Sequence, residues 1–250
     1  MKLFIDAVCD IGAVRKKNED MVLVADRIFR NDTAVVEINI DELEYPIMLG
    51  VSDGMGGHDA GEVASEIVLR KFAEATVNLG TNLNSLQLTS IFNKVAEETH
   101  EFIKTEGEKN RLKKGMGATL IGIVFYEGRL FYAGAGDSRL YRFRKGYLRQ
   151  ISKDHSISEI QGLPRERSHL IYNSIGGGES TFIDFHYIGD IILPDDVLLL
   201  CSDGLTDMLE DEELEELLIQ DYSAEDIVEL AKKSGGGDNI SLIVVDVFED

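Results

Sequence analysis

The stretch Ile47–Ser65, IMLGVSDGMGGHDAGEVAS, decides how the surrounding chain is organised. An apolar run, 47–51, ends at Ser52-Asp53-Gly54, and a run rich in alanine and glutamate follows a group of glycines. This order predicts a buried strand, a glycine loop and a helix. Asp53 would then lie at a strand end and face outward, where glycines let the backbone approach a ligand. Such a carboxylate favours Mg²⁺ or Mn²⁺, which prefer oxygen ligands, although Asp-Gly is also a common turn dipeptide.

Three other apolar runs carry an aspartate at one end, namely Asp137, Asp203 and Asp238. The first two follow their runs, Asp238 precedes its run, and Asp207 lies one turn beyond Asp203. In an antiparallel sheet the end of one strand lies beside the start of the next, so these residues and Asp53 can converge on one rim. Carboxylates on one rim raise each other's pKa unless cations offset their charge. The residues therefore predict a two-metal site with oxygen ligands, and four unrelated turns are the alternative.

Composition places the chain among soluble globular proteins and argues against two kinds of partner. Of 250 residues, 44% are apolar and 28% are charged, which is ordinary for a folded domain. Without a Pro- or Ser-rich linker or a tandem repeat, we expect a single domain over residues 1–250. The formal net charge of −21 repels nucleic acid and anionic membranes, so neither is expected as a partner.

The cysteines and the N-terminal stretch bear on the cellular compartment. Cys9 and Cys201 both lie in apolar runs, and we expect buried free thiols rather than a redox pair or a cysteine metal site. The first residues, MKLFIDAVCDIG, are too short and too acidic for a signal peptide, and no apolar run approaches ~20 residues. We therefore expect a cytoplasmic protein.

Hydrophobic periodicity predicts an α+β protein in which two packed sheets carry helices on the outside. We expect an edge strand at 3–9 and a three-stranded meander over 118–144, with a polar loop at 106–114 and irregular chain at 153–180. The remaining strands are expected at 21–25, 34–40, 47–51, 182–187, 197–201 and 240–248. Helices are expected at 60–77, 86–105, 211–220 and 224–234.

Six short motifs occur in a fixed order along the chain. They are Arg15…Asn18-Glu19-Asp20, Asp53-Gly54-Met55-Gly56-Gly57, Gly117-Ala118-Thr119, Gly136-Asp137-Ser138-Arg139, Ser202-Asp203-Gly204-Leu205-Thr206-Asp207 and Gly237-Asp238-Asn239. Each motif alone is weak, but the ordered series is specific. It resembles the metal-dependent type 2C protein phosphatases (the PPM class), most closely the bacterial branch, from about residue 6 to 248.

The resemblance implies a four-layer α-β-β-α sandwich, with two mainly antiparallel sheets flanked by helix pairs and a dinuclear Mn²⁺ or Mg²⁺ centre at one end. Asp53 would bridge both metals and the Gly54 carbonyl would ligate one of them. Asp203 and Asp238 would hold the other metal.

Further residues match the family's positions around this centre. Asp137 and Asp207, together with Asp203, match a third and weaker metal site of bacterial members. Glu19 and Asp20 match carboxylates that ligate a metal or support its ligands. Arg15 matches the arginine that grips the substrate phosphate, for which its planar fork is suited.

The activity implied is hydrolysis of phosphoserine and phosphothreonine esters by a water that bridges two metal ions, without a phosphoenzyme. Two cations roughly 3.5–4 Å apart lower the pKa of such a water and stabilise in-line displacement at phosphorus. The substrates would be phosphorylated proteins in signalling, opposite a serine/threonine kinase, and the enzyme is expected to be a monomer. Two alternatives remain: a silent pseudophosphatase that acts as a binding module, and an enzyme for small phosphate esters.

The chain departs from the family pattern at the substrate side. Met55 stands where many eukaryotic members have a histidine proposed to protonate the leaving group, which leaves the general acid unassigned, with His58 as a nearby candidate. His155 matches a position of structural character. The segment 173–178, NSIGGG, replaces an Arg-Ala-Leu-Gly-like segment, and the segment 148–169 matches a flap that varies within the family.

Overall fold

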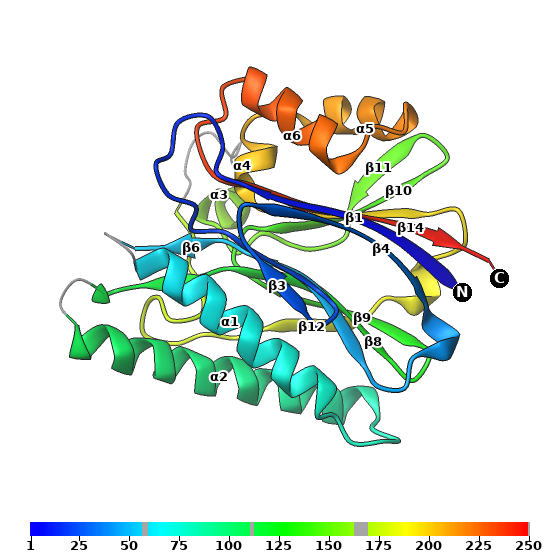
Figure 1. Cartoon of the computed structure of the whole chain (residues 1–250). Coiled ribbons are helices and arrows are strands. Elements are labelled where there is room, and N and C mark those ends of the chain that lie inside the picture. Colours follow the sequence, from blue (N-terminus) through cyan, green and yellow to red (C-terminus); the bar gives the residue numbers. More distant parts are fainter. Residues whose placement is uncertain (57–59, 111–112, 163–169, 250) are drawn as a thin grey trace.

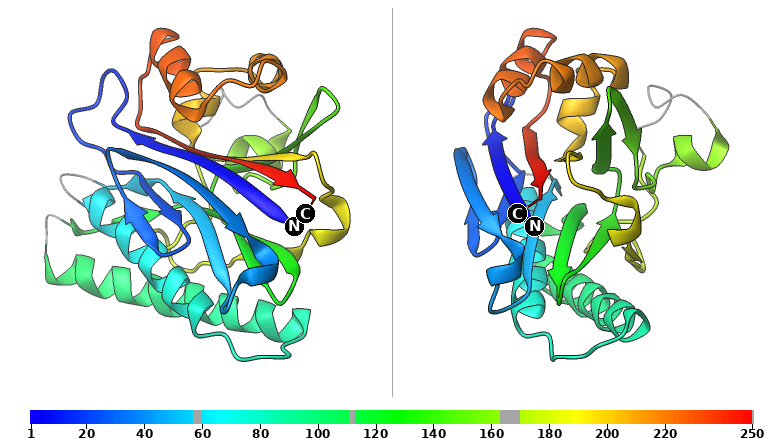
Figure 2. Two further views of the ribbon diagram at one scale, coloured as in Figure 1. Left: turned by 45° about the vertical axis from the view of Figure 1, so that its right-hand side comes forward. Right: turned by 90° about the vertical axis from the view of Figure 1, so that its right-hand side faces the viewer.

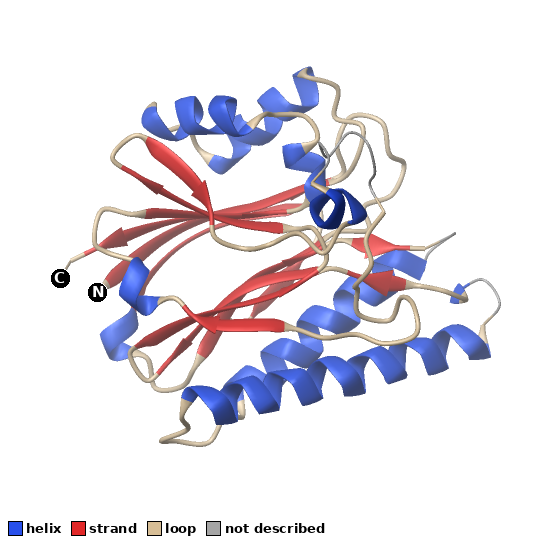
Figure 3. Cartoon of the chain, turned by 180° about the vertical axis from the view of Figure 1, so that it is seen from behind, coloured by secondary structure: helices blue, strands red, loops and turns tan. Residues whose placement is uncertain are grey.

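Two six-stranded antiparallel sheets lie face to face, and helices cover the outer face of each sheet (Figures 1 and 3). The computed structural model describes residues 1–56, 60–110, 113–162 and 170–249. The view along the sheets shows the four layers in succession (Figure 2, right). The α-β-β-α sandwich with two antiparallel sheets is therefore confirmed.

The first sheet has the order β11 (Tyr147–Gln150), β10 (Arg139–Arg144), β13 (Val197–Cys201), β14 (Ile240–Phe248), β1 (Lys2–Asp10) and β4 (Asp32–Asn39). The second has the order β12 (Asp184–Tyr187), β9 (Arg129–Ala135), β8 (Leu120–Tyr126), β5 (Ile47–Ser52), β2 (Met21–Val24) and β3 (Arg27–Phe29). A short pair, β6 (Gly54–Met55) and β7 (Gly117–Ala118), continues from the second sheet.

Helices α1 (Ala60–Val77) and α2 (Ser85–Lys109) cover the second sheet, and α5 (Asp211–Ile219) and α6 (Ala224–Lys233) cover the first. The remaining helices are short: α3 (Ile157–Gln161), α4 (Asp203–Thr206) and the 3₁₀ turns η1 (Ile40–Glu42) and η4 (Gly189–Ile191). No helix in the described ranges is long and apolar enough to cross a membrane.

The alternation of side chains along each strand explains why the layers stack. In β5, Ile47, Leu49 and Val51 point into the core between the sheets, whereas Met48 points into the core beneath α1 and α2. A period of two sends successive residues to opposite faces, so a strand that is apolar at every position must be covered on both sides. The continuous apolar runs of the sequence are thus the central strands of a four-layer protein.

Strand register places the aspartate-bearing ends at one pole of the sandwich. Ser52 at the end of β5 pairs with Met21 at the start of β2, so Asp53 and Asp20 are neighbours across that pair. In the other sheet Cys201 at the end of β13 pairs with Leu242 of β14. Both chain termini lie at the opposite pole (Figure 1).

Several boundaries differ from the sequence-based expectation. Strand β1 is not an edge strand, because it pairs with β14 on one side and β4 on the other. The expected meander is wrong at its third strand, since β10 leaves β9 and joins the other sheet. The local sequence pattern indicates which residues favour an extended backbone, but it does not indicate which strand they pair with.

Other differences concern polar segments that we expected to be irregular. Helix α2 continues through Lys109 rather than ending near 105, because Glu and Lys are strong helix formers and Gly107 of this extension is buried. Residues 157–161 form α3, with Ser156 as its N-cap. Strand β11 and the single turn α4 were also not expected.

We predict that Phe92→Ala lowers the free energy of unfolding by about 3–5 kcal/mol, because a fully buried aromatic leaves a cavity. Phe92 on α2 stacks on Phe185 with ring centroids 4.5 Å apart and lies 6.0 Å from Phe72. Leu86→Ala is the matched control, since Leu86 lies on the same helix and is 83% exposed. Urea unfolding followed by circular dichroism measures both, and equal losses would contradict this view of the core.

Candidate metal centre

Three backbone segments from the two sheets bring aspartates together at the pole opposite the termini. Asp53 follows β5, Asp20 precedes β2, and Asp203 begins α4 directly after β13. The Ser202 hydroxyl donates a hydrogen bond of 2.8 Å to Asp20 Oδ2, which ties the two sheets together at this point. The predicted convergence on one rim is therefore what the fold produces for Asp53 and Asp203, and Asp20 lies beside them.

The carboxylates at this pole perturb one another strongly. Burial raises the pKa of Asp53 well above its usual value, and the neighbouring charges of Asp20, Asp203 and Asp137 raise it further. A hydrogen bond also joins the side chains of Asp53 and Asp203. Two carboxyl groups can share such a bond only when one of them keeps a proton.

Asp20 shows the same effect in a fully enclosed position. Its side chain is 1% exposed, and burial raises its pKa to about 7 against the opposing hydrogen bonds from Ser241 and Ser202. The charges of Asp203 and Asp238 add to the increase. Negative charge is thus concentrated where the protein itself supplies little to compensate it.

Arg15 supplies positive charge at the outer edge of the cluster. Its Nη2 lies 2.7 Å from Asp238 Oδ2, and the two side chains are 51% and 37% exposed. Glu19 lies between this pair and α1; burial raises its pKa, whereas Arg15 and the backbone N–H of Gly61 lower it. Arg15 also faces the charges of Glu19 and Asp53.

The donor chemistry of this pole fits hard divalent cations. The side chains are carboxylates, and oxygen is the ligand type that Mg²⁺ and Mn²⁺ prefer. Positive ions would remove the repulsion that raises these pKa values. Among the described residues no three His, Cys, Asp or Glu side chains are already arranged as a metal cage, so the contacts are pairwise.

Close packing explains why the residue after Asp53 is a glycine, Gly54. A Cβ on Gly54 would lie 2.1 Å from the carbonyl oxygen of Gly61 and 2.6 Å from that of Glu19. The first turn of α1 can therefore approach the carboxylate loop only because both Gly54 and Gly61 lack side chains.

Two polar residues of the sequence motifs hold the loops, a role that sequence reasoning did not assign. Asn239 donates from Nδ2 to the carbonyls of Ile11 and Lys17 and accepts from the Glu19 N–H at 2.8 Å. Thr119 accepts from the Asp53 N–H at 3.0 Å and shares a hydrogen bond of 2.7 Å with Ser138. Their presence within the motifs was the signal that could have revealed this role.

No sequence motif indicated a role for Arg30 at this site. It donates from Nε to the Asp20 carbonyl and from Nη2 to the Glu62 carbonyl and the Ser65 hydroxyl. Ser65 in turn donates to the Glu19 carbonyl at 2.6 Å. Arg30 thus fixes the main chain of the Glu19-Asp20 segment against α1.

The other predicted residues occupy varied positions. Asp137 is buried and close enough to act on Asp53, whereas Asp207 ends α4, one turn after Asp203, and is exposed. Met55 lies in β6, and His58 falls outside the described residues. His155 is buried: its Nδ1 contacts the Gly136 N–H and Asn173 Nδ2, and its Nε2 contacts Asp184 at 3.1 Å. These contacts agree with a structural role.

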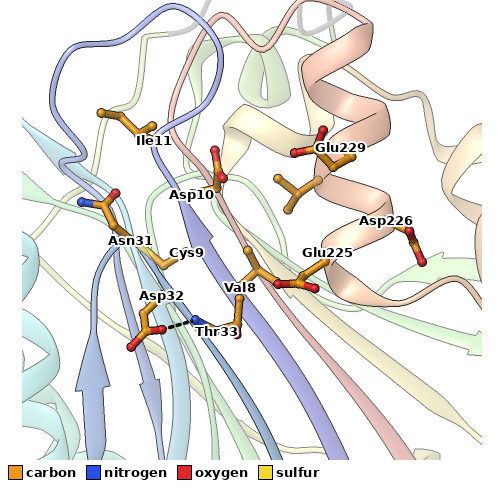
Figure 4. A pocket seen from close by; sticks show the side chains of 11 residues that line it. Val8, Cys9, Asp10, Ile11, Asn31, Asp32, Thr33, Glu225, Asp226 and Glu229 are labelled. Carbon is orange, nitrogen blue, oxygen red and sulfur yellow. Dashed lines mark hydrogen bonds between the residues drawn. The ribbon is translucent and has the colours of Figure 1, made fainter.

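A cavity of about 720 Å³ lies outside this cluster, between β1, the start of β4 and α6 (Figure 4). Its lining includes carboxylates such as Asp32, Glu225 and Glu229 but none of the predicted metal ligands. Cys9, at its inner side, is buried and free, and burial raises the pKa of its thiol to about 11. Cys201 is likewise a buried thiol that is not part of a disulfide, as expected.

Comparisons with known proteins point to one protein family. Residues 37–229 match the family model described as Protein phosphatase 2C. The serine/threonine phosphatase stp of Listeria monocytogenes is 30% identical over 95% of this chain and 93% of its own length.

Two solved structures extend the similarity to the fold. The S. agalactiae serine/threonine phosphatase superposes with a TM-score of 0.81 at 25% identity, covering 98% of this chain and 99% of that chain. The catalytic domain of the phosphatase PstP, solved in complex with two manganese ions, gives 0.74 at 31% identity over 99% and 100% of the two chains. The chain therefore belongs to the protein phosphatase 2C family and is a serine/threonine phosphatase of the bacterial type.

Proposed function

We propose that this protein hydrolyses phosphoserine and phosphothreonine esters in proteins with water as the nucleophile and without a phosphoenzyme. The observation that carries the proposal is the carboxylate cluster, in which burial raises the pKa of Asp20 and Asp53 and the nearby charge of Asp203 raises both further. The PstP structure with two manganese ions supports the same reading for a similar chain. Neither cysteine offers a nucleophile, because both are buried.

The chain's own residues would take distinct roles toward two Mn²⁺ or Mg²⁺ ions. Asp53 and the Gly54 carbonyl would hold one ion, and Asp53, Asp203 and Asp238 the other. When bound, the ions supply positive charge near the phosphoryl group and a water of lowered pKa. Glu19 and Asp20 would ligate or support the ligands, and Asp137, Asp203 and Asp207 would form a third and weaker site.

Arg15 is positioned to exchange its partner Asp238 for the phosphate group of a substrate. Its ion pair with Asp238 is half-exposed, and such pairs are worth only about 0–1 kcal/mol because water screens them. A divalent ion at Asp238 would release the guanidinium, which can then bind two phosphate oxygens at once. Arg15 therefore binds and orients substrate in this proposal and does not act on the attacking water.

The remaining features of the proposal concern the context of the enzyme. We propose one phosphatase domain over residues 1–250, with β1 and β14 paired so that both chain ends belong to one sheet. A net charge of −21 disfavours nucleic acid and anionic membranes as partners. We further propose a cytoplasmic monomer that acts on phosphorylated proteins in signalling, opposite a serine/threonine kinase.

Removing divalent ions should abolish activity. We expect EDTA to eliminate hydrolysis of a phosphothreonine peptide and added Mn²⁺ to restore it, and Asp203→Asn to lower kcat/KM by at least about 100-fold, since the ions provide the charge stabilisation. Asp26→Asn, an exposed aspartate between β2 and β3, is the control and should retain full activity. Activity that survives exhaustive chelation would reject the mechanism, and an inactive wild type would favour a binding module.

Replacing Arg15 should weaken substrate binding. We expect Arg15→Ala to raise KM for a phosphopeptide by about 10–100-fold, because a hydrogen bond to a charged group is worth about 1.5–3 kcal/mol, with a small change in kcat. Lys16→Ala removes the neighbouring exposed charge and should change KM less than about threefold. A large fall in kcat at unchanged KM would contradict the substrate-binding role.

The metal-free protein should lose stability as the pH rises. Because the pKa of Asp20 is about 7 in the folded protein and about 3.9 in an unfolded chain, the folded state holds more protons between these values. Its free energy of unfolding therefore falls from pH 4 to pH 7, by up to ~4 kcal/mol for a carboxyl shifted this far.

Urea unfolding of the EDTA-treated protein at pH 5 and 7.5 measures this slope. Asp20→Asn should flatten it, because the titrating group is gone, whereas Asp26→Asn should keep it. If Asp20→Asn and the wild type lose equal stability between the two pH values, the repulsion within the cluster is not what we describe.

A further inference from the structure

His100 is a buried histidine of α2 that none of the roles above uses. It is 2% exposed, and its Nδ1 accepts a hydrogen bond of 3.0 Å from the backbone N–H of Gly176. A neutral imidazole that accepts at Nδ1 carries its hydrogen on Nε2. Within the described ranges Nε2 makes no hydrogen bond of normal geometry, although the Glu179 and Ser174 carbonyls lie near the ring, so the bond from Gly176 is the well-formed polar contact of this side chain.

The surroundings keep His100 neutral. Burial lowers its pKa, and the ammonium of Lys104 lowers it further, whereas Glu101 and the carbonyls of Glu179 and Ser174 oppose this. The acceptor state of Nδ1 is therefore maintained near neutral pH. Lys104 also donates to the Glu179 carbonyl at 3.3 Å, so α2 contacts the same loop at a second point.

Gly176 is connected to the proposed metal centre through backbone hydrogen bonds. Its neighbour Ile175 pairs with Ala118 in both directions, with N···O distances of 2.9 Å each. Ala118 of β7 in turn lies opposite Gly54 of β6, and the next residue, Thr119, donates its backbone N–H to the Asp53 carbonyl at 2.8 Å. The path from His100 to the Gly54 carbonyl thus consists of three adjacent backbone segments.

Close packing makes this path stiff. A Cβ on Gly176, where φ is +91°, would lie 2.3 Å from Ile103 Cγ2, and a Cβ on Gly117 would lie 2.7 Å from the Gly177 nitrogen. The loop therefore has no space to shift toward α2 or β7 without moving its neighbours. At its other end Asn173 is held by His155 at 2.8 Å, so a change at His100 would act on residues 175–178.

We propose that His100 is a positioning residue of the metal centre: by holding Gly176 it fixes the row Ile175–Ala118–Gly54 and with it the Gly54 carbonyl. This inference rests on the proposed function, in which that carbonyl is a ligand. Groups that orient metal ligands without touching the metal commonly change metal affinity by about 10–100-fold when they are removed.

The test compares two substitutions that differ in the acceptor they offer. His100→Leu fills similar space without an acceptor, and His100→Asn keeps an oxygen near the position of Nδ1. We expect Mn²⁺ binding, measured by titration calorimetry on the metal-free protein, to weaken about tenfold in His100→Leu and less than about threefold in His100→Asn. If the leucine variant does not fold, His100→Gln replaces it, because its amide oxygen lies one bond farther out.

A second measurement does not depend on metal or activity. Hydrogen exchange of the metal-free protein should show faster exchange at Gly176 and Ala118 in His100→Leu, and wild-type protection in His100→Asn. Leu88→Ala is the matched control, since Leu88 is fully buried on the same helix but lies in the core. It should lower stability and leave Mn²⁺ affinity unchanged.

The outcomes separate this inference from the proposed function. Wild-type Mn²⁺ affinity and wild-type protection at Ala118 in His100→Leu would overturn the positioning role, as would an equal loss of affinity in Leu88→Ala. An inactive wild-type protein would instead reject the proposed function, while the affinities and exchange rates still decide the role of His100.

Discussion

The structure depends on the repulsion between carboxylates that two packed sheets force together at one pole. Asp53 and Asp20 come from one sheet and Asp203 from the other, and strand register fixes all three main chains. The side chains cannot separate without breaking sheet pairing, so burial and the neighbouring charges raise the pKa values of Asp20 and Asp53. The folded state therefore keeps an unfavourable repulsion that positive charge at that pole would relieve. Divalent ions can supply this charge with the smallest number of bound groups.

Hydrogen bonds from neutral side chains to the backbone hold the loops of the cluster in place. Asn239 closes the loop that carries Arg15 by bonding to Ile11, Lys17 and Glu19. Thr119 links Asp53 to the segment of Asp137 through Ser138. These bonds satisfy buried main-chain groups that would otherwise cost free energy. The acidic residues are thus held by neutral partners, which leaves their charge available to a bound cation.

Sequence reasoning found the parts of this arrangement that have a local signature. Apolar runs with aspartate at the end predicted the strands and the carboxylate rim, since the period of two and the break at Asp-Gly are properties of a few residues. The placement of β10 in the other sheet and of β1 in its interior was not predictable, because pairing joins residues as distant as Cys9 and Ser241. The role of Arg30 was also not predictable, since its contacts with Asp20 and Ser65 exist only after folding.

The same distinction separates the proposed metal centre from the segment 173–178, which we expect at the substrate side. The centre depends on side-chain oxygens of particular aspartates, which few other residues can replace. The segment 173–178 is attached through backbone bonds, such as those between Ile175 and Ala118, which do not depend on side-chain identity. A rim attached in this way can replace an arginine-containing segment with glycines and leave the carboxylates where they are. His100 is the exception, because a side chain there completes a backbone connection that leads to Gly54.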